Sequence, residues 1–170
     1  PDILFHNMKL SPSLKGLITA ALMIGVILGI YASGKDANPR LQYLVYILYA
    51  LGIVWTLFVF RRSASFTGKF GELFGQGFKC FIVVTLLMAL FYGVFNYIHP
   101  EFAEESSKAF REQLEQMVIK KEKLPTDIEP EVATFKKQYT LKLVSGAIFG
   151  YLIIGAGVTA AVSALLTRRK

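Results

Sequence analysis

The longest apolar run in the sequence is LVSGAIFGYLIIGAGVTAAVSALLT, residues 143–167, in which no Asp, Glu, Lys or Arg occurs. Three further runs without these residues cover positions 16–34, 41–60 and 80–100. A helix rises about 1.5 Å per residue, so roughly 20 apolar residues cross a hydrocarbon core of about 30 Å. The four runs therefore predict an all-α integral membrane protein whose four transmembrane helices lie at about residues 16–34, 41–60, 80–99 and 143–166.

The composition limits the chemistry that this 170-residue chain could perform. Its single cysteine, Cys80, excludes an intramolecular disulfide and a dithiol redox centre. The two histidines, His6 and His99, would lie on opposite sides of the membrane, so one protomer could not use both for the same haem or metal ion. We expect no catalytic residue, no bound cofactor and no metal site.

The distribution of charge predicts the orientation in the membrane. If the four helices alternate in direction, the N-terminus, the connection between the second and third helices and the C-terminus share one side. That side holds nine basic and two acidic residues, whereas the other side holds ten of each. Because cytoplasmic segments collect Lys and Arg, both termini are predicted to be cytoplasmic. The basic residues flank the spans instead of gathering on a soluble domain, so nucleic acid is not an expected partner.

Small residues recur at helical spacing in the first and fourth spans. Each of these two spans contains a G-x-x-x-G pair, and such pairs let another helix approach closely. The expected contact is either inside the monomer or with another protein. The residues predicted to pack in this way are Gly25, Gly29, Gly146, Gly150, Ala156 and Ala160. In the second span, Tyr49 lies deep enough to need a hydrogen-bond partner from another helix or from water.

The segment 64–79, before the third span, carries a phenylalanine at every fourth position. These residues are Phe66, Phe70, Phe74 and Phe78. The pattern predicts an amphipathic helix whose apolar stripe lies in the headgroup region or under the helix bundle. Four glycines in the same segment argue against a rigid isolated helix and indicate that the backbone passes close to another backbone. They are Gly68, Gly71, Gly75 and Gly77.

Residues 101–140 predict an extramembrane helical hairpin between the third and fourth spans, on the periplasmic side. The first helix would end before Pro125, and the second would run into the fourth span. Apolar residues spaced three or four apart mark the face along which the two helices meet. That hairpin face comprises Phe110, Leu114, Met117, Val118 and Phe135.

Four spans, the stretch SFTGKFGELFGQGFK at residues 65–79 and the Glu/Gln/Lys-rich segment before a small-residue span together resemble the DUF4199 family. This family consists of small membrane proteins found mainly in Bacteroidota, and it has no assigned activity. The resemblance covers essentially the whole chain. It implies a multi-pass protein of the bacterial inner membrane and adds no catalytic residues.

Three functions are compatible with these features. The first hypothesis is a non-catalytic accessory or scaffold subunit of an inner-membrane complex of the cell envelope. The expected partners of the protein are then the lipid bilayer and either other membrane subunits or further copies of itself. The alternative is a small transporter, channel or lipid-handling protein, although the spans lack the charged residues that transport sites usually use. The third is a surface enzyme, which is not expected because its candidate residues show no recognisable spacing. Those candidates are His99, Glu101, Glu104 and Glu105 outside, and Lys69, Glu72 and Lys79 inside.

Overall fold

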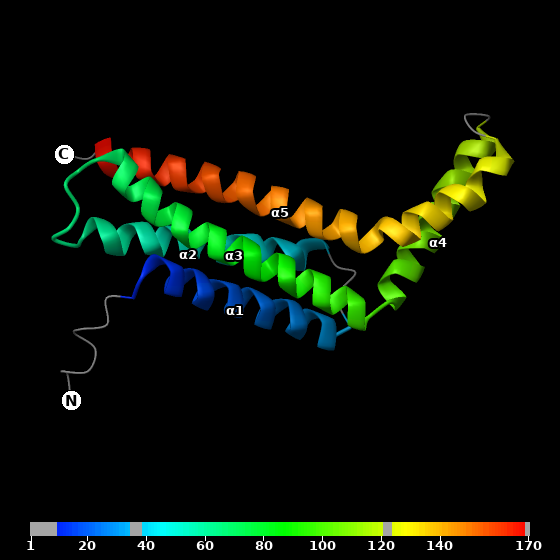
Figure 1. Cartoon of the computed structure of the whole chain (residues 1–170), viewed down its shortest axis with the longest axis horizontal. Coiled ribbons are helices and arrows are strands. Elements are labelled where there is room, and N and C mark those ends of the chain that lie inside the picture. The colour runs from blue at the N-terminus through cyan, green and yellow to red at the C-terminus, as the bar shows by residue number, and fades with distance from the viewer. Residues whose placement is uncertain (1–9, 35–38, 121–123, 169–170) are drawn as a thin grey trace. The chain divides into compact units, whose positions relative to one another are not determined.

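The computed structural model describes residues 10–34, 39–120 and 124–168, and every regular element in these ranges is helical (Figure 1). In chain order the elements are α1 (Pro12–Ala32), α2 (Pro39–Arg61), α3 (Phe70–Ile98), α4 (Glu101–Ile119), the short 3₁₀ helix η1 (Pro125–Asp127) and α5 (Ile128–Arg168). The chain forms two compact units. The first contains the described residues up to Met88 and those from Ile148 onward, and the second contains residues 89–147.

Four stretches are long and apolar enough to cross a membrane: Pro12–Ala32, Tyr43–Arg61, Phe70–Ile98 and Pro125–Arg168. The all-helical class and the four apolar helices are therefore confirmed. All four helices begin before their charge-free runs, and the difference is largest for α3, which begins at Phe70, and for α5, which begins at Ile128. Backbone hydrogen bonding continues through polar residues with good helix propensity, so the absence of charge marks the apolar part of a helix and not its ends.

The predicted amphipathic segment 64–79 is divided between a loop and a helix. Residues 64–69 are not helical, and Gly68 has a φ of 94°, a conformation that favours glycine. In the first turn of α3, Glu72 accepts hydrogen bonds from the backbone N–H and the hydroxyl of Thr67, at 2.8 and 2.5 Å. The expectation of helix before Phe70 is therefore corrected, because the glycine turn and these two contacts define where α3 begins.

The phenylalanines of this segment lie mostly away from the packed side of α3. Phe70 and Phe78 are 43% and 47% exposed, and Phe66 and Phe74 are half-buried. The buried side of α3 in the first unit instead carries Leu73, Gly77, Cys80 and Phe81. A role for the phenylalanine stripe at a membrane surface stays a prediction.

Four glycines mark the points where helices of the first unit approach most closely. A Cβ atom at Gly16 would lie 2.6 Å from the carbonyl oxygen of Cys80 in α3, and one at Gly52 would meet Thr19 of α1. A Cβ atom at Gly77 would meet Thr159, and one at Gly155 would meet Tyr49 and Phe81. Real Cβ atoms do not approach so closely, so each of these helix pairs depends on the missing side chain. The side chains that fill the core between them include Met23, Ile53, Leu57, Val84 and Met88.

In the second unit, α4 packs antiparallel to the first turns of α5 (Figure 1). The rings of Phe110 and Phe135 stack with centroids 4.4 Å apart, next to the buried Leu114. Met117 and Val118 are half-buried. Ion pairs flank this apolar strip, one joining Arg111 to Glu129 and another joining Lys136 to Glu104. The strip and the ion pairs together explain why the two helices pair in this register.

Candidate functional site

The interior of the first unit contains no carboxylate among its described residues, but it contains several hydroxyl groups. Buried Thr19, Thr56 and Thr85 each donate a hydrogen bond to the carbonyl four residues earlier in the same helix, at 2.8 to 2.9 Å. These hydroxyls are satisfied locally, as buried polar groups generally are. Their protons are therefore used within their own helices.

Tyr49 joins α2 to α5 at the centre of the unit. Its hydroxyl donates a hydrogen bond of 2.8 Å to the backbone carbonyl of Tyr151, and the two rings pack edge to face with centroids 5.2 Å apart. The tyrosine is fully buried, and Gly155 leaves the space that its hydroxyl occupies. The expected partner on another helix is therefore present.

Two further hydroxyls on α5 are less well satisfied. Thr159 and Ser163 are fully buried, and their side-chain oxygens have no hydrogen-bond partner within the described part of the chain. They lie four residues apart on the same side of α5 as Gly155. An unsatisfied buried hydroxyl costs about 1–3 kcal/mol, so this stripe is the least favourable part of the polar interior.

Lys15 is the buried cation of the first unit. Only 4% of it is exposed, and its ammonium lies 5.7 Å from the centroid of the Trp55 ring. The Cys80 sulfur lies 3.4 Å from the Thr56 hydroxyl oxygen and is close enough to interact with Lys15 electrostatically. In the sequence, Lys15 is one of the basic residues that flank the first span. Because α1 already begins at Pro12, this lysine belongs to the packed helix instead.

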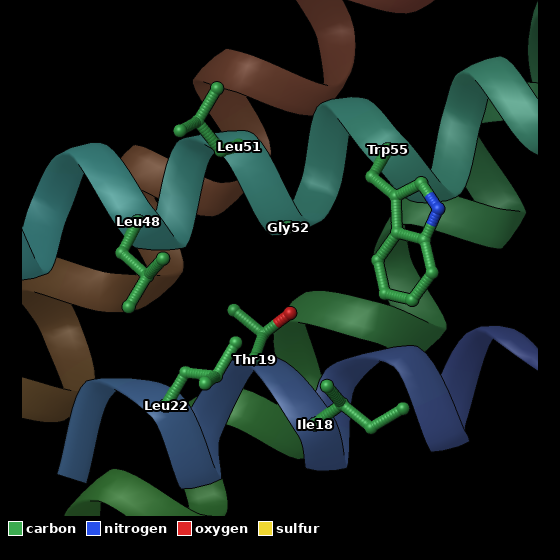
Figure 2. A pocket seen from close by; sticks show the side chains of 7 residues that line it. All are labelled: Ile18, Thr19, Leu22, Leu48, Leu51, Gly52 and Trp55. Carbon is green, nitrogen blue, oxygen red and sulfur yellow. The ribbon is translucent and has the colours of Figure 1, made fainter. Parts of the chain in front are cut away.

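An apolar groove of about 230 Å³ lies between α1 and α2 (Figure 2). It is lined by Ile18, Thr19 and Leu22 of α1 and by Leu48, Leu51, Gly52 and Trp55 of α2. Figure 2 shows the Trp55 ring and the Leu48 side chain pointing from α2 toward α1, with Gly52 opposite Thr19 between them. Leu22 and Leu51 are more than half exposed, so the groove opens to the surroundings of the helices.

The glycines that the sequence predicts to pack against another helix do not lie at the close helix crossings of the first unit. No described atom comes within 4 Å of a Cβ built at Gly25, Gly29, Gly146 or Gly150. Ala156 and Ala160 are half-buried and flank the stripe formed by Gly155, Thr159 and Ser163. The contacts inside the monomer therefore use other small residues. The signal in the sequence is a Gly, Ser or Thr at every fourth position, which marks this stripe and also the pair formed by Gly52 and Thr56.

Three of the charged residues considered for a surface enzyme, His99, Glu101 and Glu104, lie in local pairs. His99 Nδ1 lies 2.7 Å from Glu101 Oε1, and Lys136 binds Glu104. The hydrogen bond and the positive charge of Lys136 lower the pKa of Glu104 below its ordinary value. Within the described ranges, no three His, Cys, Asp or Glu residues are close enough to hold a metal ion.

These observations define the class of the protein: it is a multi-pass helical membrane protein with two compact units and four helices of spanning length. Residues 14–169 match the model of the family DUF4199, described as a protein of unknown function, and the chain belongs to this family. Neither the curated proteins nor the solved structures gave a match.

Proposed function

We propose that the protein is a non-catalytic accessory or scaffold subunit of a bacterial inner-membrane complex of the cell envelope. The observation that carries this proposal is the open small-residue face of α1. Gly25 and Gly29 are exposed, as is Ala21 one turn earlier, and a Cβ at either glycine would meet no described atom. The proposed occupant of this face is a helix of another subunit or of a second copy.

The contrast with the internal glycines supports this assignment. Where helices of the first unit meet each other closely, they do so at Gly16, Gly52, Gly77 and Gly155. Gly25 and Gly29 have no such role in the described structure. A glycine in a helix interior costs up to about 1 kcal/mol relative to alanine. In a bilayer, helices associate through close packing of small residues and not through a hydrophobic driving force. A partner helix would therefore recover the cost of both glycines.

A pair of variants tests the proposal. The double change Gly25→Leu and Gly29→Leu fills the open face, whereas Gly157→Leu places the same side chain on α5, where a Cβ also meets no described atom. Native mass spectrometry after gentle extraction should show a stoichiometric partner or second copy with the wild type and with Gly157→Leu. The double variant should retain less than about a tenth of that complex, which corresponds to roughly 1.4 kcal/mol. A wild-type monomer in several detergents and in native nanodiscs contradicts the proposal.

The proposal includes cytoplasmic termini and a periplasmic location for the pairing of α4 with α5. Supporting it, several basic residues lie in or before the first half of α3 and at the ends of α2 and α5, namely Arg61, Arg62, Lys69, Lys79 and Arg168. Cytoplasmic ends of spans typically carry such an excess. The family resemblance favours the same membrane and an origin in Bacteroidota.

Cysteine labelling tests this orientation. The native Cys80 is fully buried and can be replaced by alanine to give a cysteine-free background. Single cysteines at the exposed positions Ala64 and Gln116 then report the two sides. In intact spheroplasts, a membrane-impermeant maleimide should label position 116 and spare position 64. The reverse labelling would overturn the orientation.

A further inference from the structure

The groove between α1 and α2 has the two features that a phospholipid requires. Its lining is apolar except for Thr19, whose hydroxyl already donates to the backbone carbonyl of Lys15. The wall supplied by α2 extends from Leu48 to Trp55, which is roughly 10 Å along a helix. The groove is therefore suited to the upper part of an acyl chain and not to a polar solute.

A cation stands at one end of this groove. Lys15 lies one turn before Ile18 and Thr19, and its ammonium contacts the face of the lining Trp55 ring. It also directly precedes the first charge-free run, which starts at residue 16. This is the depth of the headgroup region, where tryptophan rings also prefer to lie.

Within the described part of the chain, no acidic side chain balances the charge of Lys15. Of the described titratable groups, only the Cys80 thiol interacts with it, and no described carboxylate forms an ion pair with it. The residue is 96% buried, since 4% of its surface is exposed. Removing an ammonium from water is costly unless an anion accompanies it, and a cation–π contact supplies only part of that compensation.

We propose that this groove binds one anionic phospholipid, with an acyl chain between α1 and α2 and the headgroup phosphate at Lys15. The phosphate supplies the negative charge that no described carboxylate supplies, and the acyl chain covers the exposed Leu22 and Leu51 at the rim. The lining does not include Gly25 or Gly29 of the proposed partner face.

The single tryptophan of the chain is a reporter placed in the site itself, since Trp55 lines the groove. The full chain is reconstituted in phosphatidylcholine vesicles that contain increasing fractions of phosphatidylglycerol brominated on its acyl chains. A second series contains brominated phosphatidylcholine instead. Bromine quenches tryptophan fluorescence only at short range, so the two series give the relative binding constant of the two headgroups at this groove.

We expect the wild type to prefer the anionic lipid about five- to tenfold, as befits one charge-assisted contact near the membrane surface. Lys15→Met keeps the apolar stem and removes the charge, and it should reduce the preference to about one. Lys79→Gln removes an exposed charge from the same end of the unit and should retain the wild-type preference.

Three results would overturn the proposal. Equal quenching by both headgroups in the wild type excludes headgroup recognition. A preference that survives in Lys15→Met assigns it to the general basic surface. Absence of quenching by either lipid shows that something else, such as a partner helix, covers Trp55. If Lys15→Met does not fold, native mass spectrometry of the wild type decides, because the proposal requires one retained phosphatidylglycerol in preference to phosphatidylcholine with the same chains.

Discussion

Replacing Gly155 with alanine adds one methyl group where α5 crosses α2 and α3. The new Cβ would collide with the Tyr49 hydroxyl and would lie 2.8 Å from Cγ of Phe81. Overfilling a packed core costs about 1–3 kcal/mol. The hydroxyl could escape only by leaving the carbonyl of Tyr151, to which it donates at 2.8 Å. A buried hydroxyl without a partner costs about 1–3 kcal/mol more.

Gly157→Ala is the matched control for this change. It lies two residues further along the same helix, and a Cβ there meets no described atom. Both variants gain the same helix propensity, up to about 1 kcal/mol, so their difference isolates the helix crossing. We expect Gly155→Ala to be less stable than Gly157→Ala by about 2 kcal/mol or more. The measurement is unfolding by sodium dodecyl sulfate in mixed micelles, followed by far-ultraviolet circular dichroism.

A double-mutant cycle identifies the atom responsible. In a Tyr49→Phe background the colliding hydroxyl is absent, so the additional cost of Gly155→Ala should fall to about half or less. Equal unfolding midpoints for Gly155→Ala and Gly157→Ala would contradict the helix crossing described here. An unchanged cost in the Tyr49→Phe background would assign the clash to Phe81 alone.

Two further predictions concern the second unit. The Glu104 carboxyl should titrate below its ordinary value near 4.5 in a carbon-detected NMR titration, and Lys136→Gln should raise its pKa again. Because the folded-state pKa is lowered, this ion pair contributes above the unfolded-state pKa and its contribution disappears as the pH falls through the folded-state value. Phe135→Ala removes the stack on Phe110, worth about 0.5–1.5 kcal/mol beyond burial, and should speed hydrogen exchange throughout α4, while Leu141→Ala at an exposed site should not.

The helices themselves could be predicted because hydropathy and charge are local properties. Each of the four apolar runs is long enough to span a bilayer without reference to the others. The face along which α4 and α5 pair could also be predicted. Phe110, Leu114 and Phe135 follow helical spacing in a polar segment, where an apolar stripe stands out from its neighbours. In the spans nearly every residue is apolar, so the spacing of apolar residues does not distinguish the packed side of a helix from its lipid-facing side.

The packing glycines illustrate that limit. A G-x-x-x-G pair shows that a helix face is able to pack, but not whether a neighbour lies against it. Gly25 and Gly29 have the pattern and meet no described atom, whereas Gly16 and Gly155 lack it and stand at the closest crossings. Which face turns inward depends on the rotation and register of each helix against the others. That information is not contained in any one segment.

The membrane class, the four helices and the family therefore follow from the order of residues alone, because they depend on the solvent preference of each segment taken separately. The groove, the burial of the Lys15 side chain and the open face of α1 follow from how the segments are assembled. Lys15 and Trp55 are 40 positions apart in the chain, and only the antiparallel packing of α1 and α2 brings the cation to the ring beside an apolar groove.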